Sequence, residues 1–165
     1  MSDITFRKAV PDDADAVGSV HFRAWIETYT GLINEEYLSK LSAERSAGIF
    51  RRTACKDLFV AVVDGEIVGF CAYSASRDAD TENCGEIQGL YVLKAYQRRG
   101  IGRKLLTLTQ DALRTDGYTS MSLWVLDSNV NAIAFYEKSG LKFDGTEKTA
   151  TIVTPITEKR YVCRL

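Results

Sequence analysis

The stretch LYVLKAYQRRGIGRKLLTLTQDAL, residues 90–113, decides the fold because an apolar run leads through a basic turn with two glycines into an amphipathic segment. The first turn of a helix presents free N–H groups and a partial positive charge, which suit an anion. Gly100 and Gly102 allow the backbone to approach a bound group closely. The side chains that add positive charge are Arg98, Arg99, Arg103 and Lys104. The turn is therefore either a phosphate site or an ordinary solvated helix start.

Two common phosphate loops do not fit this turn. A Walker loop requires GxxxxGK followed by Ser or Thr, whereas Gly102 is followed by Arg103, Lys104 and Leu105. A dinucleotide fingerprint requires GxGxxG after the first strand of a parallel sheet. This turn has only two glycines and follows the fourth predicted strand.

Composition excludes several classes of protein. The chain has 165 residues and a formal net charge of −1, so we expect one domain over residues 1–165 and no nucleic-acid binding through overall charge. No apolar run approaches membrane-spanning length, and the N-terminus has no apolar signal core, so no membrane partner is expected. The four cysteines form no CxxC pair, and with the single His21 they give no recognisable zinc site. We therefore expect free thiols, no metal and a cytoplasmic location.

Periodicity and turn residues predict the element order β α α β β β α β α β β, a mixed α/β arrangement around one sheet. Asp64 and Gly65 predict a tight hairpin, because both accept positive φ. Gly89 predicts a bulge or a close backbone approach within its strand. The predicted strands are residues 4–10, 58–63, 66–75, 85–93, 118–126, 141–146 and 158–165. The predicted helices are residues 11–29, 35–53, 100–116 and 128–140, with a polar loop over residues 76–84.

Three of these segments together resemble the GNAT superfamily of acetyl-CoA-dependent N-acetyltransferases. The sequence QRRGIG, from Gln97 to Gly102, fits the phosphate loop of the family, Q/R-x-x-G-x-G/A. The preceding GEIQGLYV resembles its central strand. SNVNAIAFYEKSGLKF, residues 128–143, resembles the segment that closes the cofactor groove, with Leu141 in place of the usual Phe. The resemblance covers nearly the whole chain. It implies an α/β (α+β) fold with a mixed, mostly antiparallel central sheet, splayed fourth and fifth strands and about four flanking helices.

The resemblance also implies where acetyl-CoA, the cosubstrate, binds. The main chain of Leu90 and Val92 would hold the pantetheine arm as an added strand would. A main-chain N–H near Tyr91 or Val92 would polarise the thioester carbonyl. Asn129 corresponds to a position that bonds the cofactor. The residues assigned to the phosphate turn are Gln97, Arg98, Arg99, Gly100, Ile101, Gly102 and Arg103.

Two residues are candidates for proton transfer. Tyr136 matches the tyrosine of the family that protonates the departing thiolate; the alternative is a half-buried tyrosine without a role. Glu86, at the start of the fourth strand, is the candidate base, either directly or through a water relay. Burial beside Ile87 and Leu90 is expected to raise the pKa of Glu86. The alternative is a strand carboxylate without a role.

The acceptor is expected across the sheet from the cofactor, near Trp25, Tyr29, Gln88 and the loop over residues 76–84. Aromatic and acidic side chains suit a cationic amine, although the same residues suit ordinary packing. The resemblance implies a primary amine as acceptor, on a polyamine-like small molecule or on a peptide, and a homodimer. Two alternatives from other classes are a non-catalytic acetyl-CoA-binding sensor and a nucleotide- or nucleic-acid-binding domain.

Overall fold

The structure is a computed structural model that describes residues 2–165. Seven strands form one sheet in the order β1-β2-β3-β4-β5-β7-β6, and only the β4–β5 pair is parallel. The strands are β1 Ile4–Lys8, β2 Leu58–Val63, β3 Glu66–Ala75, β4 Cys84–Val92, β5 Ser120–Leu126, β6 Lys142–Ile152 and β7 Thr154–Arg164. The predicted mixed, mostly antiparallel sheet is therefore confirmed.

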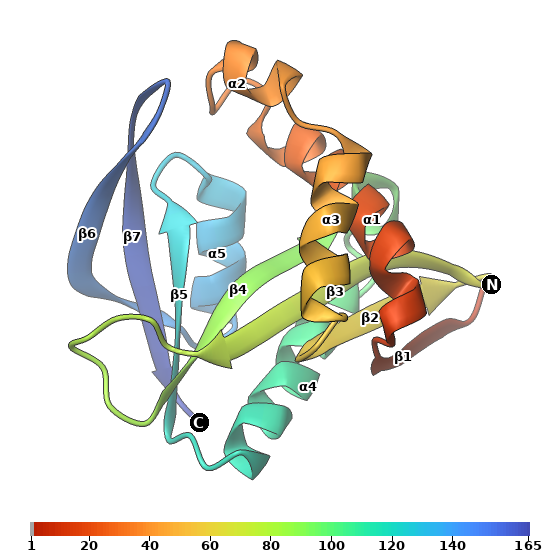
Figure 1. Ribbon diagram of the computed structural model, residues 1–165. Helices are drawn as coiled ribbons and strands as arrows, with labels where there is room; N and C mark the ends of the chain where they lie inside the picture. Colours follow the sequence, from red (N-terminus) through yellow and green to blue (C-terminus); the bar gives the residue numbers. More distant parts are fainter. Residues whose placement is uncertain (1) are drawn as a thin grey trace.

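Helices cover both faces of this sheet (Figure 1). They are α1 Ala14–Tyr29, α2 Glu35–Ser39, α3 Ala43–Thr53, α4 Ile101–Thr115 and α5 Val130–Lys138. Side chains of α1 and α3 pack on one face of β2 and β3, around Val17, Phe50 and Phe70. Side chains of α4 and α5 pack on the opposite face, around Leu105 and Tyr136. The apolar stripes of the helices thus bury both faces of the central strands.

The helix predicted over residues 35–53 is wrong, because the chain forms two helices there. The side chain of Asn34 caps α2 by accepting a hydrogen bond from the Tyr37 amide, at 3.3 Å. Ser42 starts α3 by accepting one from the Arg45 amide, at 3.1 Å. A serine inside a helical pattern competes for backbone donors, so Ser42 caps a new helix instead of continuing the first.

The fourth and fifth strands diverge as predicted. β4 pairs with β5 only over Cys84–Ile87, against Ser120–Leu123. Its pairing with β3 continues to Val92. Within residues 2–165, the other edge of β4 from Gln88 to Val92 therefore has no strand beside it. Such an edge offers main-chain donors and acceptors to an extended ligand.

One predicted turn and one predicted bulge are confirmed, and one hairpin is longer than predicted. Asp64 and Gly65 join β2 to β3 with φ of 51° and 84°. The register of β3 and β4 shifts between Ala72 and Tyr73, opposite Gly89, which is the predicted bulge. β6 and β7 extend through residues 147–157, which were not assigned to strands. On both faces of this part of β6 most side chains are polar, so the sequence shows little of the alternation of polar and apolar residues that predicts a strand.

Candidate functional site

The glycine turn places free amides beside the open edge of β4. Gly100 caps α4 with φ of 80°, a conformation that glycine adopts without strain. A Cβ on Gly102 would lie 3.4 Å from Phe135 Cζ, so the missing side chain lets α4 approach α5. Ile101 buries its side chain in the core, which leaves only its amide for a ligand. The first-turn amides and the positive end of the helix dipole therefore suit a phosphate.

In the glycine turn, Gln97 is hydrogen-bonded to the protein, whereas the arginines lie at the surface. Gln97 donates from Nε2 to the Val92 carbonyl at 3.0 Å, which ties the turn to the end of β4. Arg99 lies with its guanidinium carbon 5.7 Å from the centre of the Tyr96 ring. Arg98 and Arg103 are exposed, and Arg98 has a φ of 63°. The turn thus combines a fixed backbone with solvated positive charge.

The residues assigned to the pantetheine arm lie on the open edge, and Tyr91 has a second feature. Leu90 and Val92 are half-buried and pair with β3 on one side only. The Tyr91 hydroxyl lies 3.3 Å from the Tyr29 hydroxyl and so connects β4 to α1. Sequence reasoning assigned only the main chain of Tyr91 and did not find this contact, because it joins residues far apart in the chain.

Asn129 has a structural contact of its own. Its Oδ1 accepts a hydrogen bond from the Ala132 amide at 3.2 Å and caps α5. Its amide nitrogen Nδ2 remains a donor that a ligand can use. The predicted contact of Asn129 with the cofactor stays a prediction.

Tyr136 lies on α5 with its ring buried in the core, 8% exposed. Burial, and then the neighbouring Cys71 and Tyr29, raise the pKa of Tyr136 well above its ordinary value. The phenol therefore keeps its proton at neutral pH, as a proton donor must. Burial also raises the pKa of the adjacent Cys71 thiol to about 12. A thiolate released in the same surroundings would likewise become more basic, which favours its protonation by Tyr136.

Glu86 is buried as predicted, but the predicted direction of its pKa shift is wrong. Its carboxylate accepts hydrogen bonds from the Arg77 amide at 3.0 Å, Nε at 3.3 Å and Nη2 at 2.8 Å. Burial raises the pKa of Glu86, but the hydrogen bonds and the positive charge of Arg77 lower it by more. Glu86 is therefore ionised at neutral pH. Its role in proton transfer stays a prediction.

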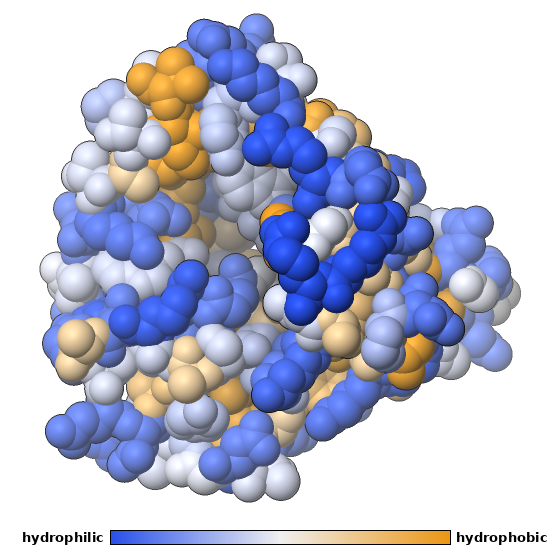
Figure 2. All heavy atoms as spheres, in the orientation of Figure 1, coloured by the Kyte–Doolittle hydropathy of each residue, from blue (hydrophilic) through white to orange (hydrophobic). Residues whose placement is uncertain are grey.

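A cavity of about 180 Å³ lies beside Glu86, between α1, the β4–β5 splay and the β6–β7 hairpin. We call it the central cavity; Figure 2 shows the surface hollowed on this side of the molecule. Its aromatic wall is Trp25, Tyr29, Tyr91 and Trp124, and its apolar end is Ile33, Leu126, Ile152 and Ile156. Its charged residues are Arg77, Glu86, Lys148 and Glu158. Ile87 and Gln88 complete the lining, so the structure brings Trp25, Tyr29 and Gln88 together in one cavity, while their role in acceptor binding stays a prediction.

Gln88 is held by a neighbouring strand. It is exposed, and its Nε2 donates a hydrogen bond to Ser74 Oγ at 2.7 Å. Its side-chain carbonyl oxygen is an acceptor that can orient a water or an ammonium group. The contribution of Gln88 to acceptor binding stays a prediction.

Sequence reasoning did not find Arg77, Lys148 or Glu158 as cavity residues. Arg77 belongs to a loop, where no periodicity predicts which side chain turns inward. Lys148 and Glu158 are directly opposite each other on β6 and β7. The charge alternation Glu147–Lys148 and Glu158–Lys159 was the one available signal, because opposite charges favour cross-strand pairing.

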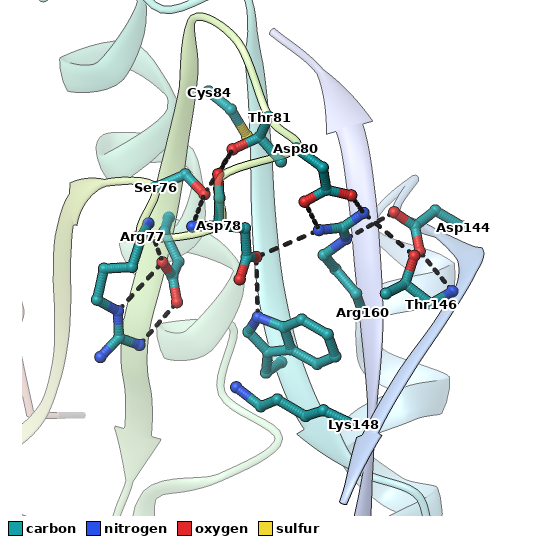
Figure 3. Close-up of polar contacts among 12 residues, drawn as sticks. Ser76, Arg77, Asp78, Asp80, Thr81, Cys84, Asp144, Thr146, Lys148 and Arg160 are labelled. Atoms are coloured by element: carbon teal, nitrogen blue, oxygen red, sulfur yellow. Dashed lines mark hydrogen bonds and ion pairs between the residues drawn. The ribbon is translucent and has the colours of Figure 1, made fainter.

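A buried arginine holds one side of the cavity in place. Arg160 on β7 is 6% exposed and contacts three carboxylates: Asp144 at 2.7 Å, Asp80 at 2.8 Å and Asp78 at 3.4 Å. Asp78 also accepts a hydrogen bond from Trp124 Nε1, at 3.0 Å. Figure 3 shows Arg160 between Asp80 and Asp144. We call these five residues the Arg160 cluster; it joins the loop after β3 to β5, β6 and β7.

His21 is occupied by packing and takes no part in the central cavity. His21 lies among aromatic rings that include Phe50 and Tyr91, with Nδ1 2.8 Å from Ser46 Oγ, and burial lowers its pKa to about 4. All four cysteines are free, as predicted. Across residues 2–165 no group of three His, Cys, Asp or Glu side chains is arranged to hold a metal ion. In the same part of the chain, no helix has the length and apolar character needed to cross a membrane.

Comparison with known proteins adds independent information. Residues 19–141 match the Acetyltransferase (GNAT) family. The chain is 31% identical over 135 residues to the uncharacterized N-acetyltransferase YuaI of Bacillus subtilis, covering 81% of this chain and 78% of the relative. It is 27% identical to the spermidine N(1)-acetyltransferase of Thermoplasma acidophilum, covering 96% and 98%. The crystal structure of the PaiA N-acetyltransferase from Thermoplasma acidophilum with coenzyme A superposes with a TM-score of 0.71 at 27% identity, covering 96% and 99%.

An open strand edge beside the first turn of a helix, with a separate cavity across the sheet, suits an acyltransferase that uses coenzyme A. With the match over residues 19–141, the chain belongs to the GNAT family of acetyltransferases. It is an acetyl-CoA-dependent N-acetyltransferase.

Proposed function

We propose that this protein transfers the acetyl group of acetyl-CoA directly to the primary amine of a small molecule or a peptide. The observation that carries the proposal is the position of Tyr136 and the central cavity on either side of the β4–β5 splay. The open edge of β4 and the amides of the glycine turn suit the two ends of the cofactor. The cavity, lined by aromatic rings and carboxylates, suits the amine.

The first step of the proposed reaction is loss of a proton from the acceptor. An alkyl ammonium group has a pKa of about 10.4, so it is mostly protonated at neutral pH and cannot attack the thioester. Glu86 is the proposed base, directly or through a water molecule. Its ionised carboxylate attracts the ammonium group, while its lowered pKa makes it a weak base. A water relay that passes the proton to solvent therefore fits Glu86 better than permanent capture of the proton.

In the second step the amine nitrogen bonds to the acetyl carbon, and the carbon–sulfur bond breaks. The bonding electrons of that bond leave with the sulfur as a thiolate. Tyr136 donates its proton to the thiolate, and solvent reprotonates the phenolate. A main-chain N–H near Tyr91 or Val92 is proposed to stabilise the carbonyl oxygen while negative charge develops there. The products are the N-acetylated amine and free coenzyme A.

The relatives support an amine acceptor of small size. One relative that matches nearly the full length is a spermidine N(1)-acetyltransferase, and this supports a polyamine-like acceptor. The small volume of the central cavity, about 180 Å³, supports a small molecule as the acceptor rather than an amine on the surface of a folded protein. A flexible peptide N-terminus is the second acceptor that such a cavity admits.

The proposal is tested with purified protein in two assays. Thermal unfolding is measured with acetyl-CoA, ATP or an oligonucleotide, because a ligand that binds the folded state raises the midpoint. We expect only acetyl-CoA to raise it. Release of coenzyme A is then measured over a panel of amines. Stabilisation by acetyl-CoA without turnover of any amine would instead indicate a non-catalytic sensor, and no stabilisation would refute cofactor binding.

We also propose that the protein acts in the cytoplasm as a homodimer, as the family resemblance implies. The four free cysteines fit a reducing compartment. Light scattering on the purified protein tests the dimer directly, because it gives the mass in solution. A mass equal to one chain at micromolar concentration would refute it.

A further inference from the structure

The charges around the central cavity occur as two ion pairs. Arg77 Nη2 lies 2.8 Å from Glu86 Oε1, and Lys148 Nζ lies 3.6 Å from Glu158 Oε2. These are the four charged residues of the lining in the described part of the chain, so the cavity is neutral as a whole. A neutral cavity does not compensate the several positive charges of a polyamine, each of which loses water on entry.

Arg77 has unused hydrogen-bond donors, whereas Glu86 has few free acceptor positions. Glu86 is buried and already accepts three hydrogen bonds from Arg77. The side chain of Arg77 is 67% exposed, and its Nη1 makes no hydrogen bond within residues 2–165. A guanidinium held by one carboxylate in this way presents a second, fixed donor edge that matches another carboxylate.

Lys148 supplies a second cation at the same cavity. Its Nζ lies 4.1 Å from the centre of the Trp124 ring and is half-exposed. The 3.6 Å separation from Glu158 exceeds a normal hydrogen bond, so the ammonium group keeps its donors for a ligand. Because Lys148 already covers a face of Trp124, that face is not open to a cationic substrate. The arrangement favours a ligand that brings a negative charge to Lys148.

We propose that the acceptor is a small amine that also carries a carboxylate, as an amino acid does. Its carboxylate binds between Arg77 and Lys148, and its amine points toward Tyr29 and Tyr91 at the β4–β5 splay. This inference rests on the proposed N-acetyltransferase function and names the acceptor class of the same site. A zwitterion matches the neutral cavity, since Arg77 and Lys148 compensate its carboxylate and the nearby carboxylates of Glu86 and Glu158 compensate its ammonium group.

The test compares acceptors that differ only in the carboxylate. Coenzyme A release is measured with the standard amino acids, with the amides and methyl esters of the best ones, and with putrescine and spermidine. We expect free amino acids to be the best acceptors. Loss of the carboxylate removes charge-assisted hydrogen bonds and should lower kcat/KM by about 10- to 100-fold.

A pair of matched lysine variants locates the effect. Lys148→Met removes the charge but keeps the alkyl chain against Trp124, and it should raise KM about tenfold for the amino acid but not for its methyl ester. Lys159→Met is the control: Lys159 also pairs with a carboxylate, Glu147 at 3.9 Å, and lies 5.2 Å from the Phe143 ring centre, but none of these lines the cavity. Lys159→Met should leave both acceptors unchanged.

The outcomes separate this inference from the proposed function. Equal turnover of free acids and esters, or better turnover of spermidine than of any amino acid, would overturn the inference and leave an N-acetyltransferase. Equal effects of Lys148→Met and Lys159→Met would also overturn it. No release of coenzyme A with any amine would defeat the proposed function, and the inference with it.

Discussion

Tyr136 has the two properties that a proton donor to a buried thiolate needs: a fixed ring and a hydroxyl that stays protonated. Tyr136→Phe removes only the hydroxyl, so we expect kcat to fall about 100-fold or more while KM for acetyl-CoA stays nearly constant. Steady-state kinetics of coenzyme A release measure both. Tyr161→Phe is the control, because Tyr161 is also a buried tyrosine with a raised pKa, but it lies on β7 and its hydroxyl donates to Glu137 Oε1 at 3.4 Å. A kcat within twofold of the native value for Tyr136→Phe would disprove the assignment.

Glu86 illustrates how one contact reverses a pKa expectation. Because its folded-state pKa lies below the ordinary value of 4.5, Glu86 stays ionised from pH 5 upward. The stability that it contributes is fully present above pH 4.5 and is lost as pH falls through the lower, folded-state pKa. The acid limb of kcat/KM near neutral pH should therefore come from another group, such as the acceptor ammonium. We expect Glu86→Gln to lower kcat without moving that limb, as a pH–rate profile measures.

Arg77→Gln provides the converse experiment. Without the guanidinium, the main-chain amide of residue 77 and Lys148 still lower the pKa of Glu86, but burial, the largest cause, is opposed by less and the pKa rises. Arg77→Gln should therefore be less stable than the native protein at neutral pH, and the difference should shrink as pH falls and the buried carboxyl takes up a proton, which thermal unfolding between pH 4 and 7 detects. An unchanged dependence of stability on pH in Arg77→Gln would show that the ion pair does not control Glu86.

The sequence predicted residues whose positions are set by regular strands and helices, and it did not predict residues whose positions depend on a loop. The positions of Glu86, Gln88 and Tyr136 follow from strand and helix register next to recognisable motifs. The partner of Glu86, by contrast, comes from a loop nine residues earlier, where no repeating pattern specifies side-chain direction. The structure was therefore needed to establish that Glu86 is ionised and paired.

At the scale of single elements, the start of α4 determines how well the cofactor turn is formed. Gly100→Ala places a Cβ at φ of 80°, which costs about 1–2 kcal/mol and shifts the first amides of the helix. We expect lower stability and a KM for acetyl-CoA raised about tenfold. Gly117→Ala, at the other end of α4, is the control because its φ is 93° and a Cβ also meets nothing within 4 Å. It should lower stability similarly and leave KM unchanged. Equal KM values in the two variants would exclude the turn from cofactor binding.

Elements with a strong local signal were predicted well. The Asp64-Gly65 turn defines the β2–β3 hairpin, and the apolar stripe of α4 fixes its face on the sheet. The length of the β6–β7 hairpin was underestimated, because cross-strand charge pairs such as Lys148–Glu158 stabilise it more than an apolar face does. Ser42 split a predicted helix because its hydroxyl caps α3. Local hydrogen bonds thus overrode periodicity where the two competed.

At the scale of the whole molecule, two halves of the sheet meet at the central cavity. The first half, β1 to β4 with α1 and α3, supplies Tyr29 and Glu86. The second half, β5 to β7, supplies Trp124, Lys148 and Glu158. Because β4 and β5 diverge beyond Ile87, side-chain contacts must hold the two halves at a fixed distance there. The apolar contacts among Trp25, Ile33, Leu126 and Ile156 do so at one end of the cavity.

The Arg160 cluster holds the two halves of the sheet together at the other end of the cavity, and this gives the last prediction. Arg160→Met leaves Asp78, Asp80 and Asp144 without their shared cation and frees the loop that carries Arg77. Loss of these charge-assisted hydrogen bonds should lower the free energy of unfolding by about 2 kcal/mol. Misplacement of Trp124 and Arg77 should lower kcat/KM for the acceptor by roughly 10- to 100-fold. KM for acetyl-CoA should not change, since the glycine turn contacts no member of the cluster.

Two further variants make this prediction specific. Arg160→Lys keeps the positive charge but loses the planar fork that bonds Asp80 through two nitrogens, so it should recover stability better than acceptor kinetics. Arg51→Gln removes an arginine that pairs with Asp15 and Glu44 on the exposed side of α1 and α3, and it should change neither acceptor nor cofactor kinetics. If Arg160→Met raised KM for acetyl-CoA as much as for the acceptor, the cluster would stabilise the whole sheet and have no particular effect on the cavity.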